Sequence, residues 1–444
     1  MYTTDIRLNG KYLDKHLMME SLAIEGYNFI NEAKDYHDLL RNADSMILSR
    51  VDEAIRKGQN LSFEQSFSGM LLVLSATNNH IRTEIFPKMT FPEAISKGTG
   101  FLTIMAQKEF SYGLTSDEIA GMVGAAILDI IFKCPAFEVI ETCGMGGDRG
   151  FGTKEVKTIN ASTLSAFVLA SIGYKTFKHG SYGNTTKIGS VDIPINFGAK
   201  ISFHSKNQIV DLFEETGFWF SDAHSVKTIH YLSHLLMIET VNHIIGPMTI
   251  PLAKEARLVK VMGINHHVDP ETIARAYNIL HQRKLLNLGE LAVVAGVNAI
   301  PNEKELQDKK WIQGHSFLDE VSPVATVVSL AEGENFVGNF LLTNNDFGCE
   351  PLPQDKLKIT NNVLDLMKAN ELALSGQDNI LASYLAQNSA LGEMLIKANG
   401  NLPESLKKLP EHYKSCLEAI KSGNVFEKLV HYVEASGGEF RSWL

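Results

Sequence analysis

The chain has 444 residues, of which 44% are hydrophobic and 21% are charged, and its formal net charge is −10. This length exceeds one ordinary hydrophobic core, so we expect two domains, or one α/β domain with a helical companion. The negative charge argues against nucleic-acid binding, because nucleic-acid-binding domains normally present a basic face to the phosphates. Any anionic ligand must therefore meet local positive charge.

The cysteines and the apolar runs indicate the compartment. Cys134, Cys143, Cys349 and Cys416 lie far apart in the sequence, without the paired spacing of a metal site or a disulfide framework. This usage is typical of a reducing compartment. The first residues are too charged for a signal peptide, and no apolar run approaches the length that crosses a bilayer. We therefore expect a cytoplasmic protein that does not bind membranes.

The amino-terminal part of the chain is predicted to be helical. Residues 1–90 show amphipathic patterns at 35–40 and 63–72, without a chemical motif. A further helix is expected over 95–110, between Pro92 and Gly113.

A second helix in this region has a clear start signal. Thr115 and Glu118 have the spacing of a capping box, and Leu114 and Ile119 are placed to form the hydrophobic staple around it. The sequence therefore predicts a helix that begins directly after Thr115.

A glycine-rich loop is the first stretch with chemical meaning. The apolar run 137–141 leads into Gly144, Gly146 and Gly147, which are followed by Asp148. Glycines let a backbone turn sharply and approach a ligand without interference from a Cβ atom. The loop therefore predicts phosphate binding, although an isolated run of this kind is usually only a turn.

The helix expected after this loop adds polar groups at its amino end. Asn160 and Ser162 can cap it, Thr158 and Thr163 supply hydroxyls, and Gly173 marks its end. Free backbone N–H groups at a helix amino end attract anions, so these groups could surround a phosphate. The simpler alternative is that they only cap the helix.

A second polar loop follows at the exit of a predicted strand. Lys178, His179 and Gly180 stand there, and further polar residues follow over 185–192. In an α/β sheet the carboxyl ends of the strands face the ligand crevice, so a cation and a titratable ring at this position indicate a binding site. Surface decoration is the alternative.

The rest of the chain alternates helices and strands. Helices are expected over 206–216, 229–245 and 271–283 and from about 357 to the end; residues 291–297 read as a buried parallel strand, and 325–343 as an antiparallel hairpin at the sheet edge. The 229–245 helix is expected to end at Gly246-Pro247. This order predicts an α/β fold, a mainly parallel central sheet with helical material before and after it.

Asp319 and Glu320 form an adjacent carboxylate pair beside apolar residues. Magnesium typically binds through one or two carboxylates together with substrate phosphates and retained waters, so the pair is a candidate Mg²⁺ site. A solvated helix start is the other interpretation.

Together these motifs resemble those of the anthranilate phosphoribosyltransferase family, which is related to the pyrimidine-nucleoside phosphorylases. The ordered set extends from roughly residue 91 to residue 436 and is highly specific, although each motif is modest. GMGGD at 144–148 is similar to the family's GTGGD, and TINAST at 158–163 is similar to its TxNxST. KHG and GSVD are similar to its KHGN and GSAD. GPMTIP at 246–251 is similar to its GPLTNP, LDEVS to its DE metal motif, and NDFG at 345–348 to its DFG.

The resemblance implies a fold with a small all-helical domain and a larger α/β domain, and an active site between them. It implies a helical domain at 91–135, completed by part of 200–250, and an α/β phosphoribosyltransferase domain at 136–444, with 1–90 as an additional amino-terminal segment. It also implies a homodimer formed through the helical domain.

The resemblance further implies that the donor is phosphoribosyl pyrophosphate with Mg²⁺. The residues that the resemblance assigns to donor binding are Gly144, Gly146, Gly147, Asp148, Thr158, Asn160, Ser162, Thr163 and Lys178. The residues that it assigns to the metal are Ser162, Asp319 and Glu320. Lys178 and His179 would be catalytic, with His179 orienting the acceptor. Displacing pyrophosphate from the ribose carbon needs little acid–base catalysis, so positioning and magnesium would carry most of the rate.

The acceptor half departs from the family pattern. Ser181 and Tyr182 stand where the family has asparagine and arginine, and an ungapped match places Ser233 and Glu239 at two family arginines. A benzoate carboxylate therefore lacks its bidentate partner. The implied acceptor-binding set, His179, Ser181, Tyr182, Ser233, Glu239 and Pro247, indicates an acceptor other than anthranilate.

Four functions remain open from the sequence. The leading one is a Mg²⁺-dependent phosphoribosyltransferase acting on another aromatic or amine acceptor. True anthranilate transfer in tryptophan biosynthesis, pyrimidine-nucleoside phosphorolysis, and a non-catalytic regulatory protein that binds a phosphorylated ligand are the alternatives.

Overall fold

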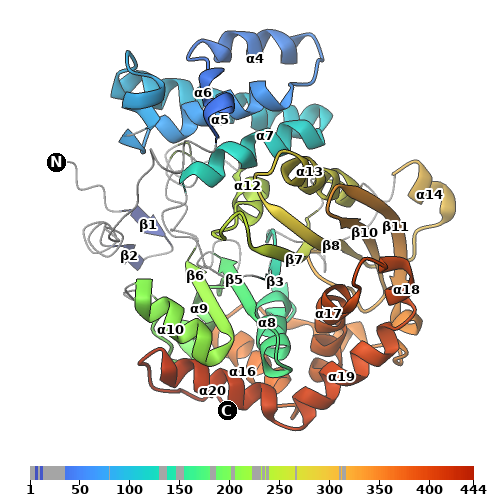
Figure 1. The fold of residues 1–444 in the computed structure, drawn as a ribbon. Helices are drawn as coiled ribbons and strands as arrows, with labels where there is room; N and C mark the ends of the chain where they lie inside the picture. The colour runs from blue at the N-terminus through green and yellow to red at the C-terminus, as the bar shows by residue number, and fades with distance from the viewer. Residues whose placement is uncertain are drawn as a thin grey trace.

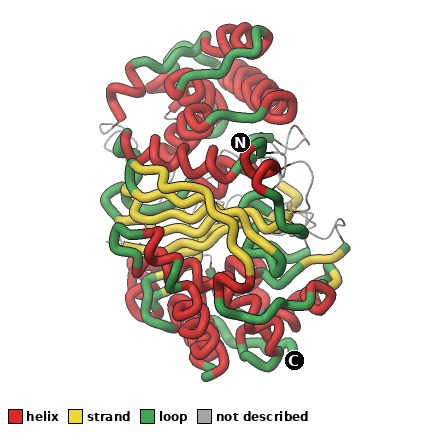
Figure 2. The backbone as a smooth tube through the Cα atoms, turned by 90° about the vertical axis from the view of Figure 1, so that its right-hand side faces the viewer, coloured by secondary structure: helices red, strands yellow, loops and turns green. Residues whose placement is uncertain are grey.

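The computed structural model describes residues 6–8, 11–13, 36–79, 81–129, 138–146, 155–180, 187–201, 206–222, 232, 236, 240–265, 268–309, 312 and 317–444. Within these residues no helix combines the length and the apolar character needed to cross a membrane. A central sheet lies between two layers of helices (Figure 2).

The central sheet has the strand order β11-β10-β8-β7-β3-β5-β6, and β9 pairs with β8 outside this path. Strands β8, β7, β3, β5 and β6 run parallel to their neighbours in this order, whereas β9, β10 and β11 pair antiparallel. The bounds are β3 Glu138–Gly144, β5 Thr176–Gly180, β6 Phe218–Asp222, β7 Arg257–Gly263, β8 Asn287–Val297, β9 Phe317–Leu318, β10 Ala325–Glu332 and β11 Asn335–Thr343. The expected mainly parallel sheet and its edge hairpin are therefore confirmed.

One face of the sheet is covered by the helices drawn in the upper half of Figure 1 and by α13. Their buried side chains form a single core with the side chains of the sheet, among them Val139, Phe177 and Leu291. The helices are α4 Ile47–Arg56, α5 Phe63–Ser75, α6 Phe91–Tyr112, α7 Ser116–Ala126, α12 Asn242–Met248 and α13 Pro270–Gln282.

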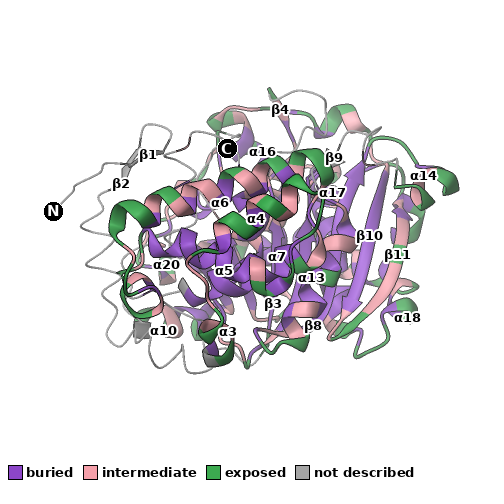
Figure 3. Cartoon of the chain, turned by 90° about the horizontal axis from the view of Figure 1, so that it is seen from above, coloured by how far each residue is buried: buried purple, intermediate pink, exposed green. Residues whose placement is uncertain are grey.

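The opposite face packs against a second layer that is built mostly from the carboxyl-terminal chain. Its helices are α8 Ala161–Ser171, α16 Val363–Leu374, α17 Asn379–Lys397, α19 Leu409–Lys421 and α20 Asn424–Ala435. Ile140 and Val259 point to this side, while their strand neighbours Val139 and Leu258 join the other core, because successive side chains of a strand alternate between faces. Figure 3 shows the strands buried between the two layers.

Shorter elements complete the fold. They are β1 Ile6–Leu8, β2 Lys11–Leu13, β4 Val156–Lys157, β12 Ile359–Thr360, α3 His37–Arg41, α9 Asp192–Asn196, α10 Lys206–Thr216, α14 Glu303–Gln307 and α18 Leu402–Leu406. The antiparallel pair of β4 and β12 ties the segment before α8 to the segment before α16.

Several helix ends follow the predicted signals. Helix α7 begins with the complete capping box of Thr115 and Glu118. Helix α6 ends at Gly113 and α10 at Gly217, and both glycines have the positive φ, 77° and 69°, that glycine adopts without a steric penalty. These local expectations are confirmed.

The predicted end of a helix at Gly246-Pro247 is wrong. Helix α12 continues through Pro247 to Met248, and the Thr249 N–H bonds to the Ile245 carbonyl at 2.9 Å, so the turn closes after the proline. Pro247 lies in the last turn of this short helix, where few turns remain to be disrupted by the missing N–H and by the ring. Residues 229–231, 233–235 and 237–239 of the expected helix lie outside the described residues.

The helices before residue 91 are part of the upper layer. Leu71 of α5 and Ile47 of α4 belong to the same core as Phe101 of α6 and Val123 of α7. The proposed division of the chain at residues 90 and 135 stays a prediction.

Candidate functional site

The carboxyl ends of β3, β5 and β7 form the centre of the candidate site. Gly144 is the last residue of β3 and lies opposite Gly263, the last residue of β7. Lys178, His179 and Gly180 are the last three residues of β5. The two polar motifs predicted from the sequence therefore meet at one edge of the sheet, where α/β folds bind ligands.

The two glycines at the strand ends make room for Asp319. A Cβ atom on Gly144 would lie 2.2 Å from the Asp319 Oδ2 atom, and a Cβ on Gly263 would lie 1.6 Å from the Asp319 carbonyl oxygen. The Gly146 N–H donates to Asp319 Oδ2 at 2.7 Å. The glycine loop and the carboxylate pair are thus brought together across 173 residues of sequence.

Glu320 is held by hydroxyl donors from both sides. The Thr158 hydroxyl donates to Glu320 Oε1, and the Tyr384 hydroxyl donates to the same oxygen at 2.8 Å. The Val321 N–H donates to Asn388 Oδ1 at 2.8 Å, which fixes the backbone after the pair. The carboxylate is therefore oriented before any ligand arrives.

The donor set of the carboxylate pair suits Mg²⁺. No group of three or more His, Cys, Asp and Glu side chains that could hold a metal occurs among the described residues. Magnesium needs no such cage, since one or two carboxylates can bind it together with substrate phosphates and waters. Asp319 and Glu320 fit that mode, and the glycine loop beside Asp319 supplies space for the phosphates.

The amino end of α8 lies beside this pair but is not capped as expected. Asn160 makes no side-chain cap bond; its N–H donates to Asn370 Oδ1 at 2.9 Å, and its Oδ1 accepts from Asn370 Nδ2 at 3.1 Å. Capping by Asn160 was therefore a wrong prediction, because the amide pairs with α16 instead. The Ser162 carbonyl accepts from the Thr142 hydroxyl at 2.6 Å, which joins α8 to β3.

Thr163 is fully buried in the first turn of α8. Its hydroxyl has no hydrogen-bond partner among the described residues. A buried hydroxyl without a partner is uncommon in folded proteins.

Lys178 and His179 point to opposite faces of the sheet, because neighbouring residues of a strand alternate. Lys178 is 1% exposed, and burial lowers the pKa of its ammonium despite the opposing effects of Cys143 and Glu141. No described residue hydrogen-bonds that ammonium. A buried cation in this state favours an anionic ligand.

His179 lies on the face toward the upper helices, in a buried group with Glu141 and Lys260. Its Nδ1 is hydrogen-bonded to Glu141 Oε1, and its Nε2 lies 3.1 Å from the Gly246 carbonyl oxygen. Lys260 Nζ donates to Glu141 Oε2 at 2.5 Å and to the Pro247 carbonyl at 2.9 Å. The structure thus brings His179 and Pro247, two members of the predicted acceptor set, close together.

The binding and catalytic roles of all the predicted site residues stay predictions, and six of these residues have no described position. Gly147 and Asp148 of the donor set, and Ser181, Tyr182, Ser233 and Glu239 of the acceptor set, lie outside the described residues. Their roles stay predictions.

Sequence reasoning missed several residues of the site. Glu141 and Lys260 interrupt apolar strands, and a charge inside such a run could have identified them. Asn370 and Tyr384 carry no comparable signal, because their helices reach the site only through tertiary packing.

Comparisons with known proteins agree with this geometry. Residues 137–296 match the family described as glycosyl transferase family, a/b domain. The chain is 27% identical over 396 residues to the anthranilate phosphoribosyltransferase of Ignicoccus hospitalis, covering 87% of this chain and 97% of that protein. It is 26% identical over 387 residues to that of Vesicomyosocius okutanii, covering 85% of this chain and 100% of that protein.

Solved structures show the same fold. Anthranilate phosphoribosyltransferase from Saccharomyces cerevisiae in complex with PRPP and Mg matches with a TM-score of 0.65 at 20% identity, over 89% of this chain and 99% of that one. The Thermus thermophilus enzyme matches with a TM-score of 0.62 at 21% identity, over 87% and 99%. Residues 137–296 thus match the glycosyl transferase family a/b domain, and most of the chain is similar to anthranilate phosphoribosyltransferases in sequence and in fold.

Proposed function

We propose that the protein is a Mg²⁺-dependent phosphoribosyltransferase that transfers the phosphoribosyl group of phosphoribosyl pyrophosphate to an acceptor other than anthranilate. One observation carries the proposal. Asp319 is seated between Gly144 and Gly263 and accepts from the Gly146 N–H, so a magnesium-type carboxylate pair and a phosphate-type glycine loop form one site. The relatives' names and the Saccharomyces cerevisiae complex with PRPP and Mg support the donor.

The residues divide the work of the reaction. Asp319 and Glu320 would hold Mg²⁺, which when bound stabilises the negative charge of the departing pyrophosphate. Lys178 and the amino end of α8 bind phosphate oxygens, and Thr158 and Tyr384 hold Glu320 in orientation. The bond from the ribose carbon to pyrophosphate breaks and a bond to the acceptor forms, so positioning of the two reactants contributes most of the rate.

The acceptor proposal rests on the chain's own residue types. On an ungapped match to the family pattern that the chain resembles, Ser233 and Glu239 fall at two family arginines. A serine hydroxyl cannot replace a guanidinium as a bidentate partner of a carboxylate, and a glutamate would repel it. We therefore infer an aromatic or amine nucleophile without the benzoate carboxylate.

Pyrophosphate release measured over a panel of acceptors tests this function. The full chain is incubated with phosphoribosyl pyrophosphate, Mg²⁺ and either anthranilate, anilines, other aromatic amines or alkyl amines. We expect release with an acceptor that lacks a carboxylate, and loss of release in Asp319→Asn and Glu320→Gln. Asp355→Asn, an exposed carboxylate variant, is the matched control and keeps the wild-type rate.

The other outcomes identify the alternatives. Turnover with anthranilate alone would make the protein a true anthranilate phosphoribosyltransferase. Phosphate-dependent release of free base from pyrimidine nucleosides would make it a phosphorylase. Donor binding without turnover of any acceptor would support a regulatory protein that binds a phosphorylated ligand.

A further inference from the structure

A fully buried ion group joins the sheet to the end of α12. Glu141 on β3 lies directly opposite Lys260 on β7, and both side chains are completely buried. Lys260 donates to one oxygen of the Glu141 carboxylate at 2.5 Å, and His179 of β5 is hydrogen-bonded to the other. One carboxylate therefore binds two basic side chains, one from each neighbouring strand.

Both basic side chains also reach successive backbone carbonyls of α12. His179 Nε2 lies 3.1 Å from the Gly246 oxygen, and Lys260 Nζ lies 2.9 Å from the Pro247 oxygen. The last carbonyls of a helix lack intrahelical partners and carry partial negative charge, so they favour cations. Lys260 therefore binds a carbonyl in the last turn of the helix, and His179 adds a second partner to the Gly246 carbonyl, which also accepts from the Thr249 N–H at 3.1 Å.

Both ring nitrogens of His179 are bound by protein groups. A carbonyl oxygen can only accept, so Nε2 donates to Gly246, while Nδ1 is hydrogen-bonded to Glu141. Burial alone would raise the pKa of Glu141, but His179 and Lys260 outweigh it and lower the pKa to about 2. No ring nitrogen of His179 is therefore left over for a ligand.

Other titratable groups around the ion group add no competing charge at neutral pH. Cys143 on β3 and Tyr277 on α13 are buried, and burial raises the pKa of both side chains. Lys178, which precedes His179 on β5, faces the other side of the sheet. Glu141 is therefore the anion that both His179 and Lys260 contact.

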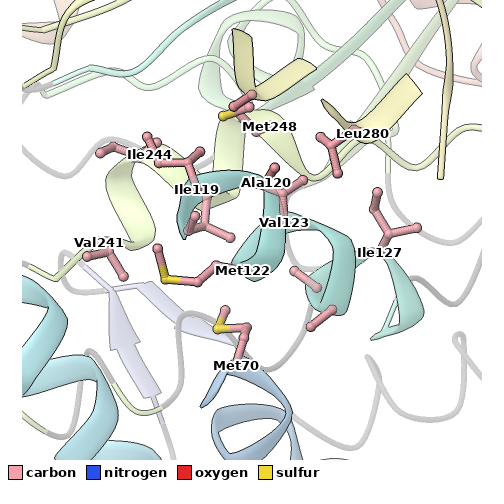
Figure 4. Close-up of a cluster of buried hydrophobic side chains, with 14 of the residues drawn as sticks. Met70, Ile119, Ala120, Met122, Val123, Ile127, Val241, Ile244, Met248 and Leu280 are labelled. Atoms are coloured by element: carbon pink, nitrogen blue, oxygen red, sulfur yellow. The ribbon is translucent and has the colours of Figure 1, made fainter. Parts of the chain in front are cut away.

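The position of α12 gives this group its role. Val241, Ile244 and Met248 lie beside Ile119 and Met122 of α7 in the upper helical core (Figure 4). The far end of the same short helix carries Gly246 and Pro247 to the strand ends that hold the donor-binding loop. The ion group thus sets the distance between the two halves of the site.

We propose that Glu141 and Lys260 are positioning residues, which with His179 hold the Gly246-Pro247 segment against the strand ends so that the acceptor meets the donor in fixed geometry. This proposal rests on the proposed function, in which Pro247 belongs to the acceptor half. It changes the role of His179, whose two ring nitrogens bind protein groups, from contacting the acceptor to placing the surface that does.

Two measurements on the full chain test the proposal without turnover. Nitrogen-15 NMR of histidine-labelled protein reports the hydrogen bonds of the two His179 ring nitrogens, whose signals are assigned by their loss in His179→Gln. Hydrogen exchange of peptides covering 240–252 reports the anchoring of α12. The variants are Glu141→Gln and Lys260→Met, and the matched controls are Glu138→Gln and Arg257→Met, an ion pair at the other end of the same two strands.

We expect both ring nitrogens of wild-type His179 to be hydrogen-bonded, and the Nδ1 signal to shift in Glu141→Gln. We expect Lys260→Met to keep the Nε2 signal and to raise exchange over 240–252 by about tenfold, as local opening becomes easier. The controls change neither reading. A ring nitrogen of wild-type His179 without a hydrogen bond, or unchanged exchange in both variants, would overturn the proposal, and the wild-type reading stands even if a variant does not fold.

Calorimetric binding of phosphoribosyl pyrophosphate with Mg²⁺ to the same proteins separates this proposal from the proposed function. If the folded Lys260→Met variant keeps its affinity for the donor and exchanges faster over 240–252, Lys260 positions the acceptor half of the site. Absence of donor binding in the wild type would contradict the proposed function and leave the NMR and exchange results to decide the positioning role.

Discussion

The Gly146 N–H donates to the Asp319 carboxylate at 2.7 Å, so the loop that follows β3 and the pair that follows β9 are held as one structure. Gly144 and Gly263 make this contact possible, because a side chain on either would collide with Asp319. The Asp319 carboxylate is therefore fixed in relation to the phosphate loop by the backbone of that loop.

Gly144→Ala should weaken donor binding while leaving the fold intact. The new Cβ would lie 2.2 Å from Asp319 Oδ2, and the carboxylate must rotate away. We expect the affinity for phosphoribosyl pyrophosphate with Mg²⁺ to fall on the order of tenfold, ~1.4 kcal/mol. Calorimetry measures this. Gly100→Ala in α6 is the control, since its Cβ meets only the end of the Leu48 side chain; equal affinities in both variants would contradict the seating of Asp319.

Tyr384→Phe should raise the Mg²⁺ concentration that donor binding requires. The hydroxyl donates to Glu320 at 2.8 Å, and its loss removes one of the two hydroxyl bonds, from Tyr384 and Thr158, to the same carboxylate oxygen. A hydrogen bond to a charged group contributes about 1.5–3 kcal/mol, so we expect roughly a tenfold higher Mg²⁺ requirement. Titration of Mg²⁺ at fixed donor measures it. Tyr174→Phe is the control, and a shift of the same size there would refute the orienting role.

Lys178→Met should weaken donor binding without lowering the thermal stability of the protein. Burial lowers the pKa of the Lys178 ammonium, which shows that the charged form is costly in the ligand-free protein. Replacing such a charge by an apolar side chain of similar length is often neutral or stabilising. We expect an unchanged or higher Tm together with donor affinity lower by about tenfold to a hundredfold. A lower Tm with unchanged affinity would show that Lys178 is structural.

Glu141 should make stability depend on acid pH. Burial opposes its ionisation, but His179 and Lys260 lower its folded-state pKa from 4.5 to about 2. A depressed carboxyl pKa contributes stability that is fully present above the unfolded pKa and is lost as the pH falls from about 4.5 toward 2, by up to about 3 kcal/mol. Between pH 6 and pH 3 the free energy of chemical unfolding should therefore fall less in Glu141→Gln than in Glu138→Gln. If the free energies of the two variants fell in parallel, the ion group would not be the source of the pH dependence.

The sequence predicted local features best. The capping box at Thr115, the glycine ends of α6 and α10, and the edge hairpin of β10 and β11 each depend on a few neighbouring residues. Capping of α8 by Asn160 failed because Asn370, 210 residues away, offers a better partner. A local pattern cannot reveal such long-range contacts.

The candidate site likewise contains residues that local motifs predict and residues whose role depends on long-range contacts. Its glycines, Lys178 and the carboxylate pair could be identified from motifs, since a phosphate loop and a metal pair need those residue types at that spacing. The buried role of His179 could not, because it depends on Glu141 and Lys260 from two other strands and on carbonyls of α12. The register of the sheet brings those groups together.

Calorimetric titration of the full chain with phosphoribosyl pyrophosphate, with and without Mg²⁺, tests the central claim most directly. The claim is that Gly144, Gly146, Asp319 and Glu320 form a donor site. We predict saturable binding that requires Mg²⁺ and is lost in the Asp319→Asn, Glu320→Gln double variant. No binding in the presence of Mg²⁺, or binding of equal strength in the double variant, would contradict it.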